Sequence, residues 1–546
     1  MVEYLLCKQK VSSSNLVGCI SIFSSLTNVS TKVKKLIMFS SVYLLLSSFF
    51  IKYLLPLITW FISFCIKYLL PLIVGIPILS SFIVFFIPPK NINSIRFMGL
   101  FSSFLVFSLT FLPLLYFNYE YGGFQFVQET MVVGLTLPFG IDGISIFFVI
   151  LTTLLIPLCL LASFNSIGKS YKKYVIAFLL MESFLILVFY SRDLLLFYIF
   201  SETILFIVLI IVGFWNSREK KIRASYMLFL YALFGSVLML LAILYIYFRV
   251  GATDYKSLIC SSFTFNEQRL IWLAFFASYG SKMLILPIKT LLEDQVKAPT
   301  LNSIVLIAIL LNTGVYSFIR FSSPILLEAA LYFKPLIFLI CSLSILGVIY
   351  ASLTAIRQTD LKRIIAYTSI AHMNLIMIGV FSFNLIGLKA AILQTLSHGF
   401  VSSALFLIIG VICDRHHTPM VKYYSGLVHT MPIFTIIFLI FTMANIALPG
   451  TSSFVGEFLI LSGDFKISLN AIFLRLLGII LLGLFYQIVY GNLKNQDFSL
   501  REFFVVLPLI IVISLMIICP GIFLDVIHSS VNNLTLYITL SIEKFS

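Results

Sequence analysis

The sequence predicts an all-α polytopic membrane protein. Of its 546 residues, 61% are hydrophobic and only 10% are charged, whereas soluble domains carry about 25% charged residues. The mean hydropathy is +1.11. The apolar residues form long continuous runs, unlike the short alternating segments of a transmembrane β-barrel. We therefore expect helices in every span and no strands.

The apolar runs divide into about 14 spans, because each helical crossing needs about 20 apolar residues. In chain order the expected spans are 67–88, 97–117, 143–164, 174–190, 194–215, 226–247, 270–288, 303–320, 334–356, 363–383, 386–411, 431–463, 468–490 and 502–526. A further candidate at 37–59 contains Lys52 and is an extra membrane segment or an interfacial helix. The expected organisation is an N-terminal extension at 1–66, a transmembrane domain at 67–526 and a C-terminal tail at 527–546.

The net charge of +15 follows a pattern typical of membrane topology rather than of nucleic-acid binding. When the spans are counted through the membrane, the basic loops return to one face. The residues on that face are Lys169, Lys172, Lys173, Arg218, Lys220, Lys221, Arg223, Arg357, Lys362, Arg363, Arg415, Lys422, Lys494 and Arg501. The opposite loops carry Glu120, Glu129 and Glu328. This positive-inside distribution orients the basic face toward the cytoplasm or the mitochondrial matrix, and we expect no nucleic-acid partner.

Metal and cofactor chemistry has no visible signature in the sequence. The eight cysteines are scattered, without the close spacing of zinc or iron–sulfur ligands. No glycine-rich nucleotide fingerprint follows a predicted strand. We therefore expect neither a metal site, nor a cofactor, nor a redox centre in this chain.

The segment from Ser281 to Pro287 places a lysine, Lys282, and a helix-breaking proline inside an apolar span. A lysine at that depth is costly and marks a functional site by default. Proline is tolerated there only inside a bundle or beside a water-filled cavity. The expected partner is Glu202, near the middle of the 194–215 span. Two interpretations of Glu202 and Lys282 follow. They are a coupled pair that holds and releases a proton, or a static ion pair that orients two helices.

Other polar residues interrupt the later spans. His372 and His398 lie in consecutive spans and titrate near neutrality, which suits a proton relay, although each could equally be a neutral histidine bonded to a helix carbonyl. Lys289 lies two turns beyond Lys282 and could share its face or extend to the basic surface. Glu182 is a further buried carboxylate in the 174–190 span.

A second interrupted helix is expected around residues 448–458, where Leu-Pro-Gly is followed by Glu457. The 431–463 run is too long to be one helix, so the Pro-Gly pair predicts a break. Two interrupted spans, far apart in the chain and each beside a buried charge, are the sequence pattern of a transporter built from repeats.

These motifs resemble the subunit 4 family of mitochondrial respiratory complex I, the proton-translocating NADH:ubiquinone oxidoreductase. The resemblance runs from about residue 67 to the C-terminus and is carried by residues 140–148, 221–226, 358–367 and 448–458. It implies two inverted five-helix repeats with two broken helices. It also implies the roles of the polar residues: Glu202 modulates Lys282, His372 and His398 connect the two halves, and Glu457 is the exit-side carboxylate.

The sequence departs from the family between residues 281 and 312. Where the family usually has a lysine in the span after the first broken helix, this chain has Asn312. An amide can orient water but cannot carry a proton at physiological pH. The following loop also lacks its usual histidines, and Lys289 could supply the missing charge.

The expected function is therefore a proton-translocating subunit of the complex I membrane arm in the mitochondrial inner membrane. The resemblance implies neighbouring antiporter-like subunits as partners, with flavin, iron–sulfur clusters and ubiquinone bound by other subunits. Cardiolipin is the lipid expected at the basic loops. The alternatives are a scaffold subunit that no longer conducts protons, which Asn312 favours, and a subunit of a cation/proton antiporter.

Overall fold

The computed structural model describes residues 68–132, 135–167, 170–215, 221–261, 263–283, 309–326, 334–416, 418–424, 427–464 and 497–543. Within these ranges, ten helices are long and apolar enough to cross a membrane. The prediction of a helical, polytopic membrane protein is thus confirmed. The expected N-terminal extension and the candidate spans at 37–59 and 468–490 lie outside the described residues.

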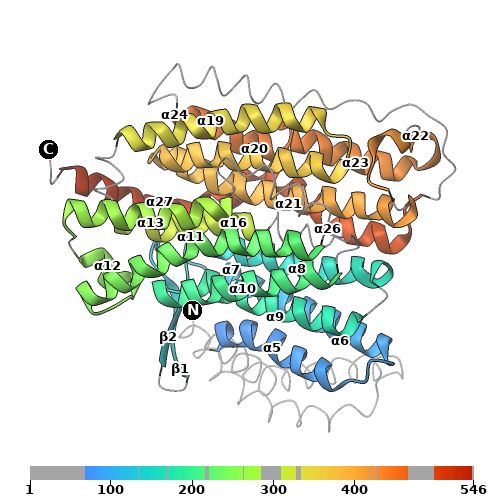
Figure 1. Ribbon diagram of the computed structural model, residues 1–546, viewed down its shortest axis with the longest axis horizontal. Helices are drawn as coiled ribbons and strands as arrows, with labels where there is room; N and C mark the ends of the chain where they lie inside the picture. Colours follow the sequence, from blue (N-terminus) through green and yellow to red (C-terminus); the bar gives the residue numbers. More distant parts are fainter. Residues whose placement is uncertain are drawn as a thin grey trace, which may run out of the picture. The chain divides into compact units, whose positions relative to one another are not determined.

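The longer helices follow the predicted spans closely (Figure 1). They are α5 (Leu69–Phe86), α6 (Ile92–Leu109), α8 (Ser145–Ser166), α9 (Tyr171–Tyr190), α10 (Leu194–Trp215), α11 (Lys221–Val250), α13 (Phe265–Met283), α19 (Lys334–Arg357), α20 (Leu361–Phe381), α21 (Leu385–His416), α23 (Pro432–Asn445), α24 (Ser452–Asp464), α26 (Leu500–Ile518) and α27 (Pro520–Glu543). The short elements are α7 (Phe111–Leu115), α12 (Tyr255–Cys260), α16 (Leu311–Ser317), the π-helical turn η3 (Phe318–Ser322), α17 (Ser323–Ile325), the 3₁₀ turn η4 (Val421–Tyr423) and α22 (Leu427–Thr430). The helix α27 runs through residues that the sequence assigned to a C-terminal tail.

The expectation that the chain has no strands is wrong between residues 125 and 141. The strands β1 (Gln125–Val132) and β2 (Leu135–Ile141) pair antiparallel. Their segment is too short and too polar to cross a membrane, and residues such as Phe126, Val127 and Thr130 favour extended structure. The backbone N–H of Arg192 donates to the carbonyl of Pro138 (3.1 Å), which ties β2 to the start of α10.

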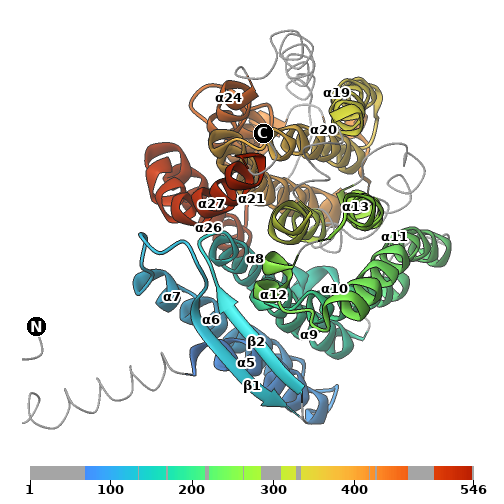
Figure 2. The same cartoon turned by 90° about the vertical axis from the view of Figure 1, so that its left-hand side faces the viewer.

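The interior of the bundle is formed by the most buried helices. In α20, 94% of the most apolar window is buried, against 28% in α26. Figure 2 shows α8, α20 and α21 inside the bundle, and α5, α11 and α26 toward its outside. The outer helices expose large apolar side chains such as Phe82, Phe234 and Ile511, as expected for surfaces that face lipid. The buried polar residues therefore lie on the inward faces of their helices, while the outward faces of helices such as α10 expose apolar side chains.

The predicted break in the 431–463 span is present between α23 and α24. Ala447 has φ +57° and Gly450 has φ +91°, so the chain reverses its local twist on either side of Pro449. An alanine in this left-handed region is strained by roughly 1–2 kcal/mol, which indicates that the surrounding packing enforces the break. The other expected break, at Pro287, lies beyond the last described residue of α13.

Candidate functional site

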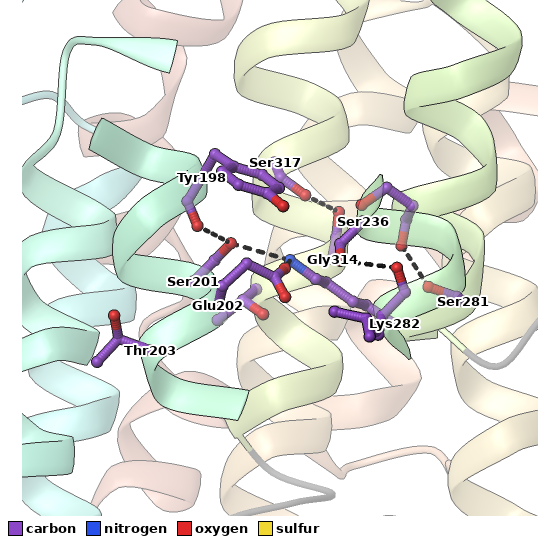
Figure 3. A network of polar contacts seen from close by, with 12 residues as sticks. Tyr198, Ser201, Glu202, Thr203, Ser236, Ser281, Lys282, Gly314 and Ser317 are labelled. Carbon is purple, nitrogen blue, oxygen red and sulfur yellow. Dashed lines mark hydrogen bonds and ion pairs between the residues drawn. The ribbon is translucent and has the colours of Figure 1, made fainter. Parts of the chain in front are cut away.

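Lys282 and Glu202 meet inside the bundle, as the sequence predicted. The lysine Nζ lies 3.8 Å from Glu202 Oε1 and donates a hydrogen bond to Ser201 Oγ (3.1 Å). Ser201 and Glu202 are adjacent on α10, so one turn of that helix presents both a hydroxyl and a carboxylate to the lysine (Figure 3). Lys282 is 5% exposed. A buried ammonium is thus stabilised by one carboxylate at a distance longer than a hydrogen bond.

Small residues make room for Lys282 between its neighbouring helices. A Cβ on Gly314 would lie 3.3 Å from Lys282 Cβ and 2.8 Å from the Cγ of Met283. A Cβ on Gly235 would lie 2.7 Å from Ser281 Oγ. The two glycines therefore allow α16 and α11 to approach α13 closely. The side chain of Lys282 extends from α13 toward Ser201 and Glu202 of α10 (Figure 3).

His372 and Glu457 form the second polar cluster, between α20 and α24. Their Nδ1 and Oε1 atoms lie 2.9 Å apart, and both side chains are almost fully buried. The amide Nε2 of Gln394 on α21 also donates to Glu457 Oε1 (3.2 Å). The other ring nitrogen of His372 lies 2.8 Å from the backbone carbonyl oxygen of Asn445, the last residue of α23. Four helices thus converge on one imidazole–carboxylate pair.

His398 and Asn312 lie between the two clusters. The rings of His398 and His372 have centroids 5.4 Å apart. A Cβ on Gly399, the residue after His398, would lie 2.8 Å from Asn312 Nδ2, so the amide packs directly against α21. Asn312 is 1% exposed. Among the described residues, neither amide atom of Asn312 nor the Nε2 of His398 has a hydrogen-bond partner. Such buried polar groups are commonly satisfied by ordered water.

Glu182, a further predicted residue, does not join these clusters. Glu182 on α9 is fully buried, and in the part of the chain that the structure describes its carboxylate oxygens accept no hydrogen bond. It forms no described contact with Lys282 or His372. Lys289 lies outside the described residues, so its predicted role stays a prediction.

A pocket opens between α20, α21 and α23 and reaches Asn445. Its lining includes Leu361 and Ile365 in the first turns of α20, Ile409 near the end of α21, and Thr442 on α23. These ends of α20 and α21 carry the basic loops, so the pocket lies on the basic side of the His372–Glu457 pair.

Several polar residues of the site escaped the sequence analysis. No feature of the sequence marks Ser201 as a site residue, because serines are frequent in apolar helices. Gln394 lies one turn from His398 on the same helix. A glutamine in an apolar span is unusual, and this is the sequence signal that would have identified it. The same is true of Asn445, whose side-chain Nδ2 donates to Thr368 Oγ1 (3.1 Å).

A further buried ion pair was also missed. Arg320 in the π-helical turn lies 2.9 Å from Asp142 Oδ2. The guanidinium stacks over Phe124 (3.9 Å) and Tyr255 (4.3 Å). Asp142 also accepts from the backbone N–H of Ser145 (2.9 Å) at the start of α8. This pair joins the hairpin, α8 and η3 at one end of the bundle.

Comparison with known proteins identifies the relatives of the chain. The family described as "NADH:quinone oxidoreductase/Mrp antiporter, TM" matches residues 191–483. The NADH-ubiquinone oxidoreductase chain 4 of Marchantia polymorpha is 48% identical over 478 residues, which cover 85% of this chain and 96% of the relative. The chain 4 of Arabidopsis thaliana is 47% identical over 473 residues, covering 84% and 95%. Among solved structures, a chain of respiratory complex I from Thermus thermophilus matches with a TM-score of 0.78 and 25% identity, covering 86% of this chain and 99% of that one.

Proposed function

The chain belongs to the NADH:quinone oxidoreductase/Mrp antiporter transmembrane family, and from that premise we propose that it moves protons across the membrane within respiratory complex I. The observation that carries this proposal is the pairing of buried titratable groups. Lys282 lies against Glu202, and His372 lies against Glu457, with the paired side chains inside the bundle. Buried ionisable groups of this kind are expensive to maintain in a membrane and are expected to serve transport.

The first pair works electrostatically in this proposal. At 3.8 Å, two unit charges interact by about 4 kcal/mol at an effective dielectric constant of 20. A change in the Glu202–Lys282 distance therefore changes how tightly the lysine holds its proton. The gap is wider than a hydrogen bond, so the pair can tighten or loosen without breaking a directional bond. A charge change in a neighbouring subunit would supply the signal.

In the proposed mechanism, the cluster of His372 and Glu457 receives the proton and then releases it. In this proposal, water bound by the polar atoms of Asn312 and His398 that lack a partner among the described residues would link Lys282 to His372. Glu457 is the exit-side carboxylate in this proposal. Asn312 takes part by orienting water, because its amide cannot exchange a proton at neutral pH.

The setting of this activity is the mitochondrial inner membrane. The partners are the other membrane-arm subunits, including antiporter-like neighbours, and cardiolipin bound at the basic loops. Electron transfer from NADH to ubiquinone takes place in other subunits, which hold flavin, iron–sulfur clusters and quinone. This chain contributes the coupled proton movement to that enzyme.

A scaffold role is the second candidate, and one observation favours it. Asn312 stands at the centre of the bundle where the family usually has a titratable lysine. A subunit that holds the arm together while protons cross elsewhere would tolerate that change. A cation/proton antiporter is a third and weaker reading, which copurification of the chain with NADH-oxidising subunits would exclude.

The decisive experiment compares Lys282→Met with Lys90→Met in the intact complex. Lys90 lies in an exposed turn before α6, so its loss is a matched removal of charge outside the bundle. We expect Lys282→Met to lower the number of protons moved per NADH oxidised, while Lys90→Met leaves that ratio unchanged. An unchanged ratio in an assembled Lys282→Met complex would support the scaffold role instead.

A further inference from the structure

The break between α23 and α24 leaves one backbone carbonyl without a helical donor. In a continuous helix the carbonyl of Asn445 would accept from the N–H of residue 449. Residue 449 is proline and has no N–H. The neighbouring N–H groups are used elsewhere, since that of Ile446 donates to Thr442 O (3.1 Å) and that of Leu448 donates to Met443 O (3.3 Å).

The freed carbonyl takes a side chain as its donor. His372 Nε2 lies 2.8 Å from Asn445 O, and a carbonyl oxygen can only accept a hydrogen bond. The Nε2 atom must therefore carry a hydrogen. The Asn445 side chain also holds α20, because its Nδ2 donates to Thr368 Oγ1 (3.1 Å) one turn before the histidine. The end of α23 is thus fastened to α20 through both its carbonyl and its side chain.

With a hydrogen on Nε2, the contact between His372 Nδ1 and Glu457 has only a few possible positions for its proton. Nδ1 and Glu457 Oε1 lie 2.9 Å apart, a distance at which two lone pairs without a hydrogen between them would repel. At least one proton must lie between these atoms. It resides on Nδ1, giving imidazolium and carboxylate, or on Oε1, giving neutral imidazole and carboxylic acid. Both forms have zero net charge, so moving this proton from N–H···O⁻ to N···H–O requires no other reactant.

We propose that the carbonyl of Asn445, freed where α23 ends at the left-handed Ala447 and Pro449 prevents the helix from continuing, is a positioning group that fixes His372 as an Nε2–H donor and so confines proton exchange to the Nδ1–Glu457 side of the ring. Without this anchor the imidazole could exchange tautomers and pass a proton through either nitrogen. With it, the histidine and the carboxylate act as one site holding one exchangeable proton. This inference rests on the proposed proton movement for its purpose, but its geometry stands independently of pumping.

The donor from α21 supports the same assignment. Gln394 Nε2 donates to the Glu457 oxygen that faces His372. A Cβ on Gly456 would lie 2.5 Å from Gln394 Oε1, so α24 is packed closely enough against α21 to keep the amide in place. An amide N–H on that oxygen stabilises the carboxylate, so it favours the form in which the shared proton lies on Nδ1.

The test is nitrogen NMR on the intact complex with ¹⁵N-labelled histidine. A His372→Gln complex serves as the reference, since subtraction leaves the signals of His372 alone. We expect Nε2 to be protonated at every pH at which the complex is intact, with any titration confined to Nδ1. A neutral ring with a bare Nε2 would overturn the proposal, whether or not the complex pumps protons.

Two proline variants extend the test. Pro449→Ala allows the helix to continue past Ala447 and restores the N–H that would then compete for the Asn445 carbonyl, and we expect a roughly fivefold rise in the alternate tautomer, the change that corresponds to one ordinary hydrogen bond. Pro432→Ala is the matched control, because Pro432 stands at the start of the same helix, where a missing N–H frees no carbonyl. Equal tautomer populations in both variants would refute the role of Pro449. A normal tautomer in a complex whose proton ratio is insensitive to Lys282→Met would refute the pumping function alone.

Discussion

Removing the carboxylate of Glu202 isolates the ammonium of Lys282, and the structure sets the size of the effect. The pair is separated by 3.8 Å, with side-chain exposures of 12% for Glu202 and 3% for Lys282. Removing one partner of a buried ion pair lowers the free energy of unfolding by about 3–5 kcal/mol. The carboxylate is partly exposed and the two charges are far apart for an ion pair, so the cost for this pair should lie near the lower end of that range. We expect Glu202→Gln to destabilise the subunit by about 3 kcal/mol.

A double-mutant cycle separates this energy from other effects of each substitution. Lys282→Met alone leaves a carboxylate without its cation and is expected to cost a similar amount. The double variant removes both charges, so its cost should fall well below the sum of the single costs, giving a coupling of about 2–3 kcal/mol. The assay is the resistance of this subunit to pulse proteolysis across a series of denaturing detergent concentrations, with proton translocation measured on the same preparations.

The two readouts distinguish the proposed roles. A pump predicts that all three variants lose coupled proton movement, even where the double variant recovers stability. A scaffold predicts the same stability cycle with an unchanged proton ratio. Additive single costs, with a coupling below about 0.5 kcal/mol, would show that the two charges do not interact and would refute the electrostatic reasoning itself.

Three further predictions follow from contacts elsewhere in the bundle. Gly456→Ala would place its Cβ 2.5 Å from an α21 side-chain oxygen, so we expect a cost of about 1–3 kcal/mol from overpacking and a longer His–Glu contact, visible in a structure of the variant. Asp142→Asn should cost about 3–5 kcal/mol, more than Glu202→Gln, because Arg320 lies 2.9 Å from the carboxylate; the measurement is the yield of assembled complex. Glu267 has a pKa of about 2, lowered chiefly by the Tyr245 hydroxyl and then by the N–H at the start of α13. Its stabilising contribution is therefore present near neutrality and lost as pH falls toward 2, so Glu267→Gln should make stability less dependent on pH in an acid titration followed by circular dichroism.

Much of the site could be predicted because a charge in an apolar run is conspicuous. Lys282, Glu202 and Glu457 each interrupt a span, and the cost of burying them alone implies partners inside the bundle. The break near Pro449 was predictable for the same reason, since proline and glycine have fixed backbone consequences. The hairpin was missed because its strands are short, show no clear alternation of polar and apolar residues, and lie between two long spans that dominate the hydropathy.

The unpredicted part of the site consists of groups without a distinctive residue type. The carbonyl of Asn445 belongs to the backbone, which every residue shares, and only its place four residues before a proline marks it. The pairing of His372 with Glu457 rather than with His398 depends on how α20 and α24 are rotated against each other. Such rotation is set by packing over the whole bundle, and no local pattern encodes it.

The two clusters are each electrically balanced, and this constrains any transfer between them. Glu202 with Lys282 can hold one negative and one positive charge, and His372 with Glu457 shares one proton at zero net charge. A proton moved from the first pair to the second leaves one site negative and the other positive in a medium of low dielectric constant, so the two sites attract and the proton tends to return. With a lysine at position 312, the separated charges would be partly compensated along the way. Asn312 supplies no such compensation, so under the proposed function forward movement would depend more strongly on a charge arriving beside Glu202 from a neighbouring subunit, and leakage without that signal would be correspondingly suppressed.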